Sequence, residues 1–159
     1  MKLYFMRHGL AGDPTTWEGP DEERPLTSKG RKRLADSAKL MKKQGLDFDW
    51  ILTSPLKRAY QTAKIVAEEL DLGNILREEP RLGPGFDPDK LLAILQEFPG
   101  AQSLLLVGHE PGFSTTASHL IGGGRLVCKK GSLLRIDLEE PLTLQGELVW
   151  LIPPAVLAD

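Results

Sequence analysis

The chain has 159 residues, of which 41% are apolar and 26% are charged, and its formal net charge is −2 at pH 7. This length is enough for one domain, over residues 1–159, to bury a core without a disulfide or a metal. The interspersed acidic and basic residues argue against the basic face that nucleic acid or an anionic membrane requires, so we expect a soluble partner or substrate. The single cysteine, Cys128, excludes an intrachain disulfide and a CxxC zinc knuckle.

Strand-like runs alternate with helical patterns along most of the chain. Short apolar runs predict strands at residues 2–6, 50–53 and 103–107, with a weaker one at 74–77. Between these runs, the apolar residues recur at roughly the helical period. Such alternation predicts an α/β fold with a largely parallel sheet.

Helix start signals lie between these runs. At two places, a Ser or Asp that can cap a helix stands directly before a proline, which suits the first helical position. A threonine N-cap and a terminal glycine bound another helix. The predicted helices cover residues 27–45, start at the N-cap Ser54, start at the N-cap Asp87, and follow Pro111.

The pattern changes in the last part of the chain. From Arg125 onward, β-type runs are separated by Gly-containing pairs at residues 130–131 and 145–146. Turns of this kind join antiparallel strands. We therefore expect antiparallel strands on one side of the sheet, which makes the sheet mixed.

The sequence shows no pattern typical of a targeting or membrane segment. The longest apolar runs have the length of strands, and the amino terminus lacks the long apolar stretch of a signal peptide. These features predict a cytoplasmic protein.

Charged side chains follow three of the predicted strands. Arg7 and His8 follow the first, Arg58 lies one helical turn beyond the second, and His109 follows the strand at 103–107. Ligands of open α/β sheets collect at the carboxyl ends of the strands, so we expect these residues to converge. Guanidinium groups match the oxygens of a multiply charged anion, and phosphate is the expected ligand.

His8 is the candidate nucleophile. A neutral imidazole is a good nucleophile near pH 7, and its attack on phosphorus gives a covalent phosphohistidine that water later cleaves. The two arginines and His109 would stabilise the charge of the transferring phosphoryl group, the task that Mg²⁺ performs in other sites. The sequence thus predicts phosphoryl transfer without a metal or a cofactor.

Three motifs, in this order, resemble those of the histidine phosphatase superfamily. They are RHG at residues 7–9, SPLKRAYQTA at residues 54–63 and GHEPG at residues 108–112. The segment DEERPLTSKG at residues 21–30 is similar to the DxxRPLTxxG segment of the small SixA-like phosphohistidine phosphatases. Those proteins often have alanine after the catalytic histidine, where this chain has Gly9.

The resemblance implies a three-layer α/β/α sandwich with a mixed, mostly parallel central sheet, as in phosphoglycerate mutase. It also implies a phosphohistidine phosphatase that uses a histidine nucleophile. Arg24 either lines the phosphate pocket or holds its loop by an ion pair with Asp21 or Glu22. The implied catalytic and phosphate-binding residues are Arg7, His8, Arg58 and His109.

The presence or absence of a general acid affects which class of substrate the site can use. Larger members that act on phosphate monoesters commonly supply a carboxylic acid after the third strand, where Glu78, Glu79 and Asp87 lie, but no motif singles one out. Asp87 is more simply explained as a helix cap, with the general acid as the lesser alternative. An alkoxide needs a positioned acid, worth typically ~100-fold or more, whereas an imidazole with a pKa of about 6.5 can leave without one. A protein-borne phosphohistidine is therefore the leading substrate, and a small phosphate ester is the alternative.

Two other functions stay open. One is a non-catalytic module whose arginines hold a phosphorylated partner. The other is a metal hydrolase that uses His8, His109 and His119, although no ligand spacing such as HExxH supports it. His119 lies off the apolar stripe of its helix and is expected at the surface. The basic run at residues 29–33 is expected to be a solvated helix face, which could steer an acidic protein domain.

Overall fold

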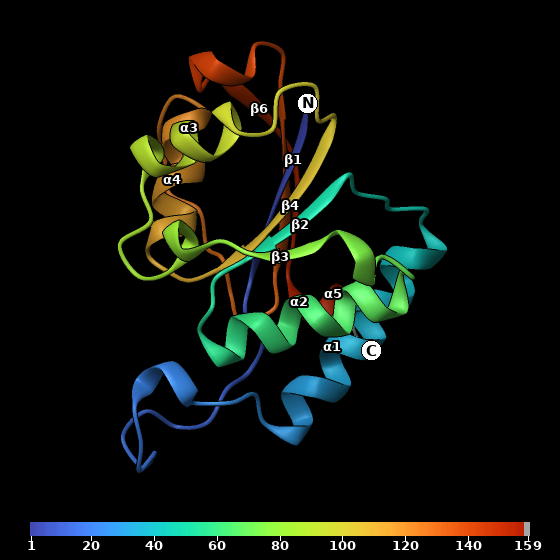
Figure 1. Ribbon diagram of the computed structural model, residues 1–159, viewed down its shortest axis with the longest axis vertical. Helices are drawn as coiled ribbons and strands as arrows, with labels where there is room; N and C mark the ends of the chain where they lie inside the picture. The colour runs from blue at the N-terminus through green and yellow to red at the C-terminus, as the bar shows by residue number, and fades with distance from the viewer. Residues whose placement is uncertain (158–159) are drawn as a thin grey trace.

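A six-stranded sheet with helices on both faces forms the body of the molecule in a computed structural model that describes residues 1–157 (Figure 1). Its strands are β1 (Lys2–Arg7), β2 (Trp50–Thr53), β3 (Leu76–Glu78), β4 (Ser103–Gly108), β5 (Leu133–Leu138) and β6 (Gly146–Ile152). They lie in the order β3-β2-β4-β1-β5-β6. The first four of these run parallel, and β5 pairs antiparallel with β1 and β6. The predicted mixed, mostly parallel sheet is confirmed.

The helices make the outer two layers. Helices α1 (Ser28–Lys43), α2 (Lys57–Glu69) and α5 (Pro154–Leu157) cover one face, and α3 (Pro88–Gln96) and α4 (Gly112–Leu120) cover the other (Figure 1). Short 3-10 helices are η1 (Asp21–Glu23), η2 (Gly73–Ile75), η3 (Pro80–Leu82) and η4 (Pro141–Thr143). Within residues 1–157, no helix has the length and apolar character needed to cross a membrane.

Burial on both faces explains the apolar strand sequences. Along β1, Leu3 and Phe5 belong to the core beneath α3 and α4, whereas Tyr4 and Met6 belong to the core beneath α1 and α2. Successive strand residues point to opposite faces, so a strand covered on both sides is apolar at every position. The same reason explains the run of leucines in β4.

Two predicted N-caps are confirmed. The hydroxyl of Thr27 accepts a hydrogen bond from the N–H of Gly30 at 2.9 Å, and α1 starts directly after it. The carboxylate of Asp87 accepts one from the N–H of Lys90, also at 2.9 Å, at the start of α3. The predicted helix end is also confirmed, because Gly45 follows α1 with a φ of 71°, a conformation that glycine adopts without strain.

The predicted N-cap at Ser54 is wrong. Helix α2 begins at Lys57, and its N-cap position is Leu56, whose side chain cannot accept a hydrogen bond. The hydroxyl of Ser54 instead accepts a hydrogen bond from the N–H of Leu56 at 3.2 Å, in a local turn that spans Pro55. This turn delays the helix and leaves Ser54 buried at the end of β2.

Two predicted strands are shifted. Residues 73–75 form η2, so the third strand starts at Leu76 rather than at residue 74. Residues 124–129 have no regular secondary structure, although the sequence predicts a β-type run from Arg125. The carbonyl of Cys128 accepts a hydrogen bond from the Arg7 side chain, and the N–H of Gly131 donates to the end of β1, so this stretch contacts the site instead of forming a strand.

Candidate active site

The carboxyl ends of β1, β2 and β4 bring the predicted residues together. Arg7 ends β1, and the N–H of His8 donates to the carbonyl of Gly108 at the end of β4 at 3.0 Å. The rings of His8 and His109 lie 5.3 Å apart between centroids. The side chains of His8, Arg58 and His109 are almost wholly buried, so the charge of Arg58 acts on the two imidazoles through little water.

Local contacts set the protonation of His8. Its Nδ1 lies 2.8 Å from the carbonyl oxygen of Gly9, and because a carbonyl can only accept, Nδ1 has the proton and Nε2 keeps its lone pair. The pKa of His8 is lowered to about 3, mainly by burial and also by the neighbouring His109 and Arg58, against the opposing effect of the Gly9 bond. At neutral pH, His8 is therefore an uncharged imidazole with a free Nε2, the form that a nucleophile needs.

Arg7 and Arg58 are each held by hydrogen bonds from part of the guanidinium group. Arg7 Nη1 donates to the carbonyl of Cys128 at 3.0 Å. Arg58 donates from Nη1 to the carbonyl of Asp21 at 2.9 Å and from Nη2 to its carboxylate at 3.0 Å. These bonds fix the planes of both groups and leave the Nε atoms unused.

The loop between β1 and α1 closes over Arg58. It extends from the lower end of the sheet (Figure 1), and Arg24 holds it by donating to the carboxylate of Asp21 at 3.0 Å and to the carbonyl of Gly12 at 2.7 Å. The hydrogen bond from Arg24 is the main reason that the pKa of Asp21 is lowered, which keeps this carboxylate ionised. The sequence left open whether Arg24 lines the pocket or forms an ion pair with Asp21 or Glu22, and the structure shows the ion pair with Asp21. Because Asp21 also accepts from Arg58, this pair connects the two arginines.

His109 contacts the serine for which the sequence predicted only a cap. Its Nε2 lies 2.8 Å from Ser54 Oγ, and its Nδ1 is buried with no hydrogen-bond partner in the described part of the chain. Burial and the charge of Arg58 lower the pKa of His109 to about 4, so this imidazole is also neutral. The sequence position of Ser54 could have predicted this contact. Ser54 directly follows β2, and β2 is the neighbour of β4, the strand that precedes His109.

Three buried nitrogens of the site have no hydrogen-bond partner within residues 1–157. They are Arg7 Nε, Arg58 Nε and His109 Nδ1, and they come from three separate segments. A buried donor that is left unpaired costs free energy, and the oxygens of a tetrahedral anion offer several acceptors at once. A fourth unpaired atom, Thr116 Oγ1, belongs to α4. The donors of the site thus fit a phosphate-like anion.

Thr62 connects the loop of His8 to the helix of Arg58. The N–H of Gly9 donates to Thr62 Oγ1 at 3.1 Å, and this hydroxyl donates to the carbonyl of Arg58 at 2.7 Å. A Cβ atom at Gly9 would lie only 2.5 Å from Leu34 Cδ1 on α1. An alanine after His8 would therefore require the Leu34 side chain to shift.

The carboxylates after the third strand have other contacts. Glu79 binds Arg81 through both oxygens at 2.7 Å, and these hydrogen bonds lower the pKa of Glu79, so it is ionised and cannot donate a proton at neutral pH. Glu78 is exposed, and the half-buried Asp87 caps α3. His119 is exposed at the far end of α4, as expected. In the part of the chain that the structure describes, no group of three or more His, Cys, Asp and Glu residues is arranged to hold a metal ion.

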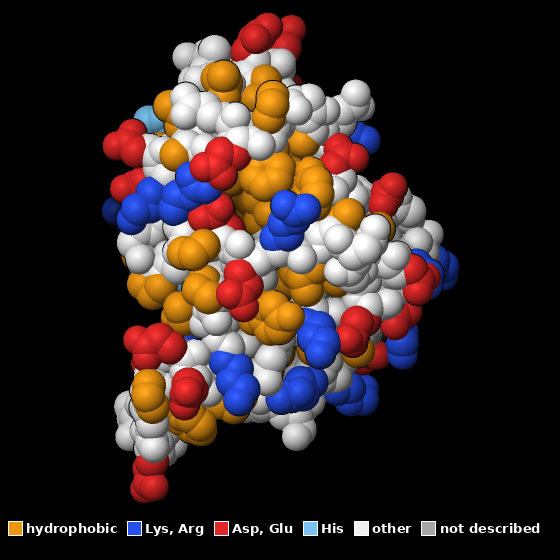
Figure 2. Space-filling model, viewed as in Figure 1, with side chains coloured by type: hydrophobic (Ala, Val, Ile, Leu, Met, Phe, Trp, Pro, Cys, Tyr) orange, Lys and Arg blue, Asp and Glu red, His pale blue; other side chains and the backbone are white. Residues whose placement is uncertain are grey.

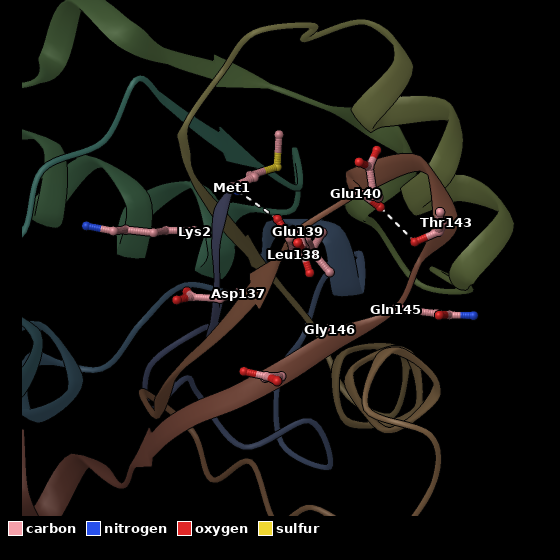
Figure 3. A pocket seen from close by; sticks show the side chains of 10 residues that line it. Met1, Lys2, Asp137, Leu138, Glu139, Glu140, Thr143, Gln145 and Gly146 are labelled. Atoms are coloured by element: carbon pink, nitrogen blue, oxygen red, sulfur yellow. Dashed lines mark hydrogen bonds between the residues drawn. The ribbon is translucent and has the colours of Figure 1, made fainter.

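A separate pocket lies near the amino end of β1, opposite the site (Figure 3). Its volume is ≈ 620 Å³, and the amine of Met1 donates to the carbonyl of Leu138 beside it. Its acidic lining residues are Asp137, Glu139, Glu140 and Glu147. These carboxylates would repel a phosphate group, so this pocket does not suit the expected anion.

Comparison with known proteins agrees with this geometry. Residues 3–82 match the model of the histidine phosphatase superfamily (branch 1). An uncharacterized protein of Picosynechococcus sp. is 40% identical over 167 residues, which cover 96% of this chain and 100% of that protein. The chain belongs to the histidine phosphatase superfamily.

Within this superfamily, the chain is SixA-like. It is 33% identical to phosphohistidine phosphatase SixA of Escherichia coli over 113 residues, which cover 70% of this chain and 68% of SixA. A solved structure of the protein histidine phosphatase SixA complexed with tungstate superposes with a TM-score of 0.87 at 27% identity, covering 98% of each chain. The three-layer fold implied by the motifs is thereby confirmed.

Proposed function

We propose that this chain, as a single domain over residues 1–159, is a phosphohistidine phosphatase with His8 as its nucleophile. The observation that supports this most is the neutral, buried His8, whose free Nε2 belongs to a site with three buried nitrogens that have no partner within residues 1–157. Arg7, Arg58 and His109 bind the phosphoryl oxygens, and the buried Arg24 supports Arg58 through Asp21. The protein acts in the cytoplasm, on a phosphorylated protein.

The proposed reaction has two displacements. Nε2 of His8 attacks phosphorus while the bond from phosphorus to the substrate imidazole breaks, and that electron pair stays on the leaving nitrogen. The imidazole leaves neutral when its other nitrogen already has a proton. Water then attacks the phosphorus on His8, the electron pair of the broken bond returns to Nε2, and the proton of the water goes to phosphate or solvent. Throughout, the carbonyl of Gly9 stabilises the positive charge that develops on the His8 ring.

The contacts of the carboxylates favour phosphohistidine over an ester as the substrate. Glu79 is tied to Arg81, so it is not free to protonate an alkoxide, and one oxygen of Asp87 is already used to cap a helix. The name of the Escherichia coli relative, phosphohistidine phosphatase SixA, supports the same substrate class. Basic side chains over α1 and α2, visible in the lower half of Figure 2, offer an exposed positive surface to an acidic protein domain.

One observation favours small phosphate esters as the second candidate. Asp87 is a half-buried carboxylate that follows the third strand, and only its Oδ1 has a hydrogen bond within residues 1–157. If the substrate is a phosphate ester, Asp87 would donate the proton to the leaving alkoxide as the general acid.

Phosphate release separates these candidates. We expect a higher kcat/KM for a histidine-phosphorylated protein domain than for sugar phosphates or p-nitrophenyl phosphate. His8→Ala abolishes release and the acid-labile phosphate that is trapped on the wild-type protein. The exposed His119→Ala is the matched control and keeps both. A preference for monoesters, or activity that survives His8→Ala, contradicts the proposal. Binding without release would indicate a phosphate-binding module.

A further inference from the structure

A buried hydroxyl at the end of β2 contacts the second histidine of the site. The side chain of Ser54 is inaccessible to solvent, and its Oγ has two hydrogen-bond contacts among residues 1–157. It lies 2.8 Å from His109 Nε2, and it accepts the N–H of Leu56 at 3.2 Å. Because the Leu56 bond uses a lone pair, the hydroxyl proton still requires an acceptor.

The direction of the bond between Ser54 and His109 decides the tautomer of the histidine. If the hydroxyl donates to Nε2, the proton of the neutral imidazole is on Nδ1. If Nε2 donates instead, the buried hydroxyl proton has no acceptor, and Nδ1 has a lone pair that would repel an anion's oxygen. Each arrangement leaves one buried donor unpaired within residues 1–157: Nδ1–H in the first and the hydroxyl proton in the second. Only the second also leaves Nδ1 as an unpaired acceptor, so the first is favoured.

We propose that Ser54 is a positioning residue that holds His109 as the Nδ1–H tautomer and so makes Nδ1 a hydrogen-bond donor to a phosphoryl oxygen. Nδ1 is one of the buried nitrogens without a partner, as is Nε of Arg58. Because burial lowers the pKa of His109 to about 4, the ring is neutral at pH 7, and only the tautomer decides whether Nδ1 can donate. The effect on catalysis rests on the proposed phosphatase function, whereas the tautomer itself does not.

The tautomer can be observed without any substrate. Nitrogen-15 to proton correlation spectra of the histidine side chains in the wild-type chain at pH 7 show which ring nitrogen is protonated. We expect His109 to have its proton on Nδ1, whereas the exposed His119 exchanges between tautomers and serves as the internal control. A spectrum in which the His109 proton is on Nε2 overturns the proposal.

Variants connect the tautomer to catalysis. Ser54→Ala removes the donor, so we expect His109 to lose its tautomer preference and kcat for p-nitrophenyl phosphate to fall ~10-fold or more. Ser54→Thr retains the hydroxyl, so it is expected to keep the tautomer and most of kcat. The matched control is Ser103→Ala at the opposite end of the sheet, where the hydroxyl donates to the carbonyl of Asp47. This change should leave kcat and the His109 spectrum unchanged.

The tautomer spectrum of His109 and the measured kcat separate this inference from the proposed function. If the wild-type protein releases no phosphate but His109 is the Nδ1–H tautomer, the phosphatase proposal fails and the tautomer assignment stands. If the protein is active and Ser54→Ala retains both the tautomer and kcat, the role of Ser54 is overturned. The wild-type spectrum decides the assignment even if Ser54→Ala does not fold.

Discussion

Arg58 donates two hydrogen bonds to Asp21, one to its carbonyl and one to its carboxylate, across a sequence separation of 37 residues. The pair orients the guanidinium group, so that Nε of Arg58 is left unpaired inside the site. The Asp21 side chain is 55% exposed, so water screens its charge and the orientation of Arg58 is its main contribution.

Replacement of Asp21 should weaken substrate binding. In Asp21→Ala, Arg58 loses one of its two fixed hydrogen bonds and Arg24 loses its ion pair, so the guanidinium planes become mobile. We expect KM for p-nitrophenyl phosphate to rise ~3- to 10-fold, with a smaller change in kcat. The control is Glu22→Ala, since Glu22 is exposed and adjacent in η1. Equal effects of the two variants would rule out the positioning role of Asp21.

The buried histidines should make stability depend on pH between about 6 and 5. Burial is the main reason that the folded-state pKa is about 3 for His8 and about 4 for His109, against a usual value of 6.5. Below pH 6.5 the unfolded chain binds protons that the folded chain does not, so the free energy of unfolding falls as pH falls. The loss is about 1 kcal/mol per histidine for each pH unit in this window.

Urea denaturation at pH 6 and pH 5 measures this loss. The window lies above the usual carboxylate pKa range, so the Asp and Glu residues contribute little to it. His8→Gln should remove roughly half of the pH dependence. A wild-type free energy of unfolding that stays constant from pH 6 to pH 5 would show that the site histidines are not held neutral.

Thr62 and Thr116 form a matched pair for a stability test. Both are inaccessible to solvent, but among residues 1–157 only the hydroxyl of Thr62 has hydrogen bonds, which join Gly9 to Arg58. Thr62→Val keeps the shape and leaves the N–H of Gly9 unpaired, so we expect a loss of about 1–3 kcal/mol in the free energy of unfolding. Thr116→Val removes an unpaired hydroxyl and should be neutral or stabilising. Chemical denaturation of both variants checks this, and equal losses would contradict the role of Thr62.

The strand order and the contacts between distant segments came from the tertiary structure, whereas the elements themselves were largely readable from the sequence. The apolar runs in β1 and β4 and the caps at Thr27 and Asp87 depend on neighbours within four residues. Such local signals place His8 and His109 at strand ends.

Ser54 shows where local signals fail. Serine before proline is a good helix start, but here the hydroxyl contacts a histidine that is 55 residues away, and α2 starts later. The stretch before β5 shows the same limit, because Arg7 reaches the carbonyl of Cys128 across 121 residues.

The sequence by itself determined the α/β class, most of the helix and strand positions, and the His and Arg residues proposed for catalysis. Only the tertiary structure decided the neutral state of the two imidazoles, the contact of Ser54 with His109, and the closure of the Asp21 loop over Arg58. The physical reason is the separation along the chain over which each interaction acts. Apolar periodicity and capping act between residues a few positions apart, whereas burial and side-chain hydrogen bonds depend on which distant segments pack together.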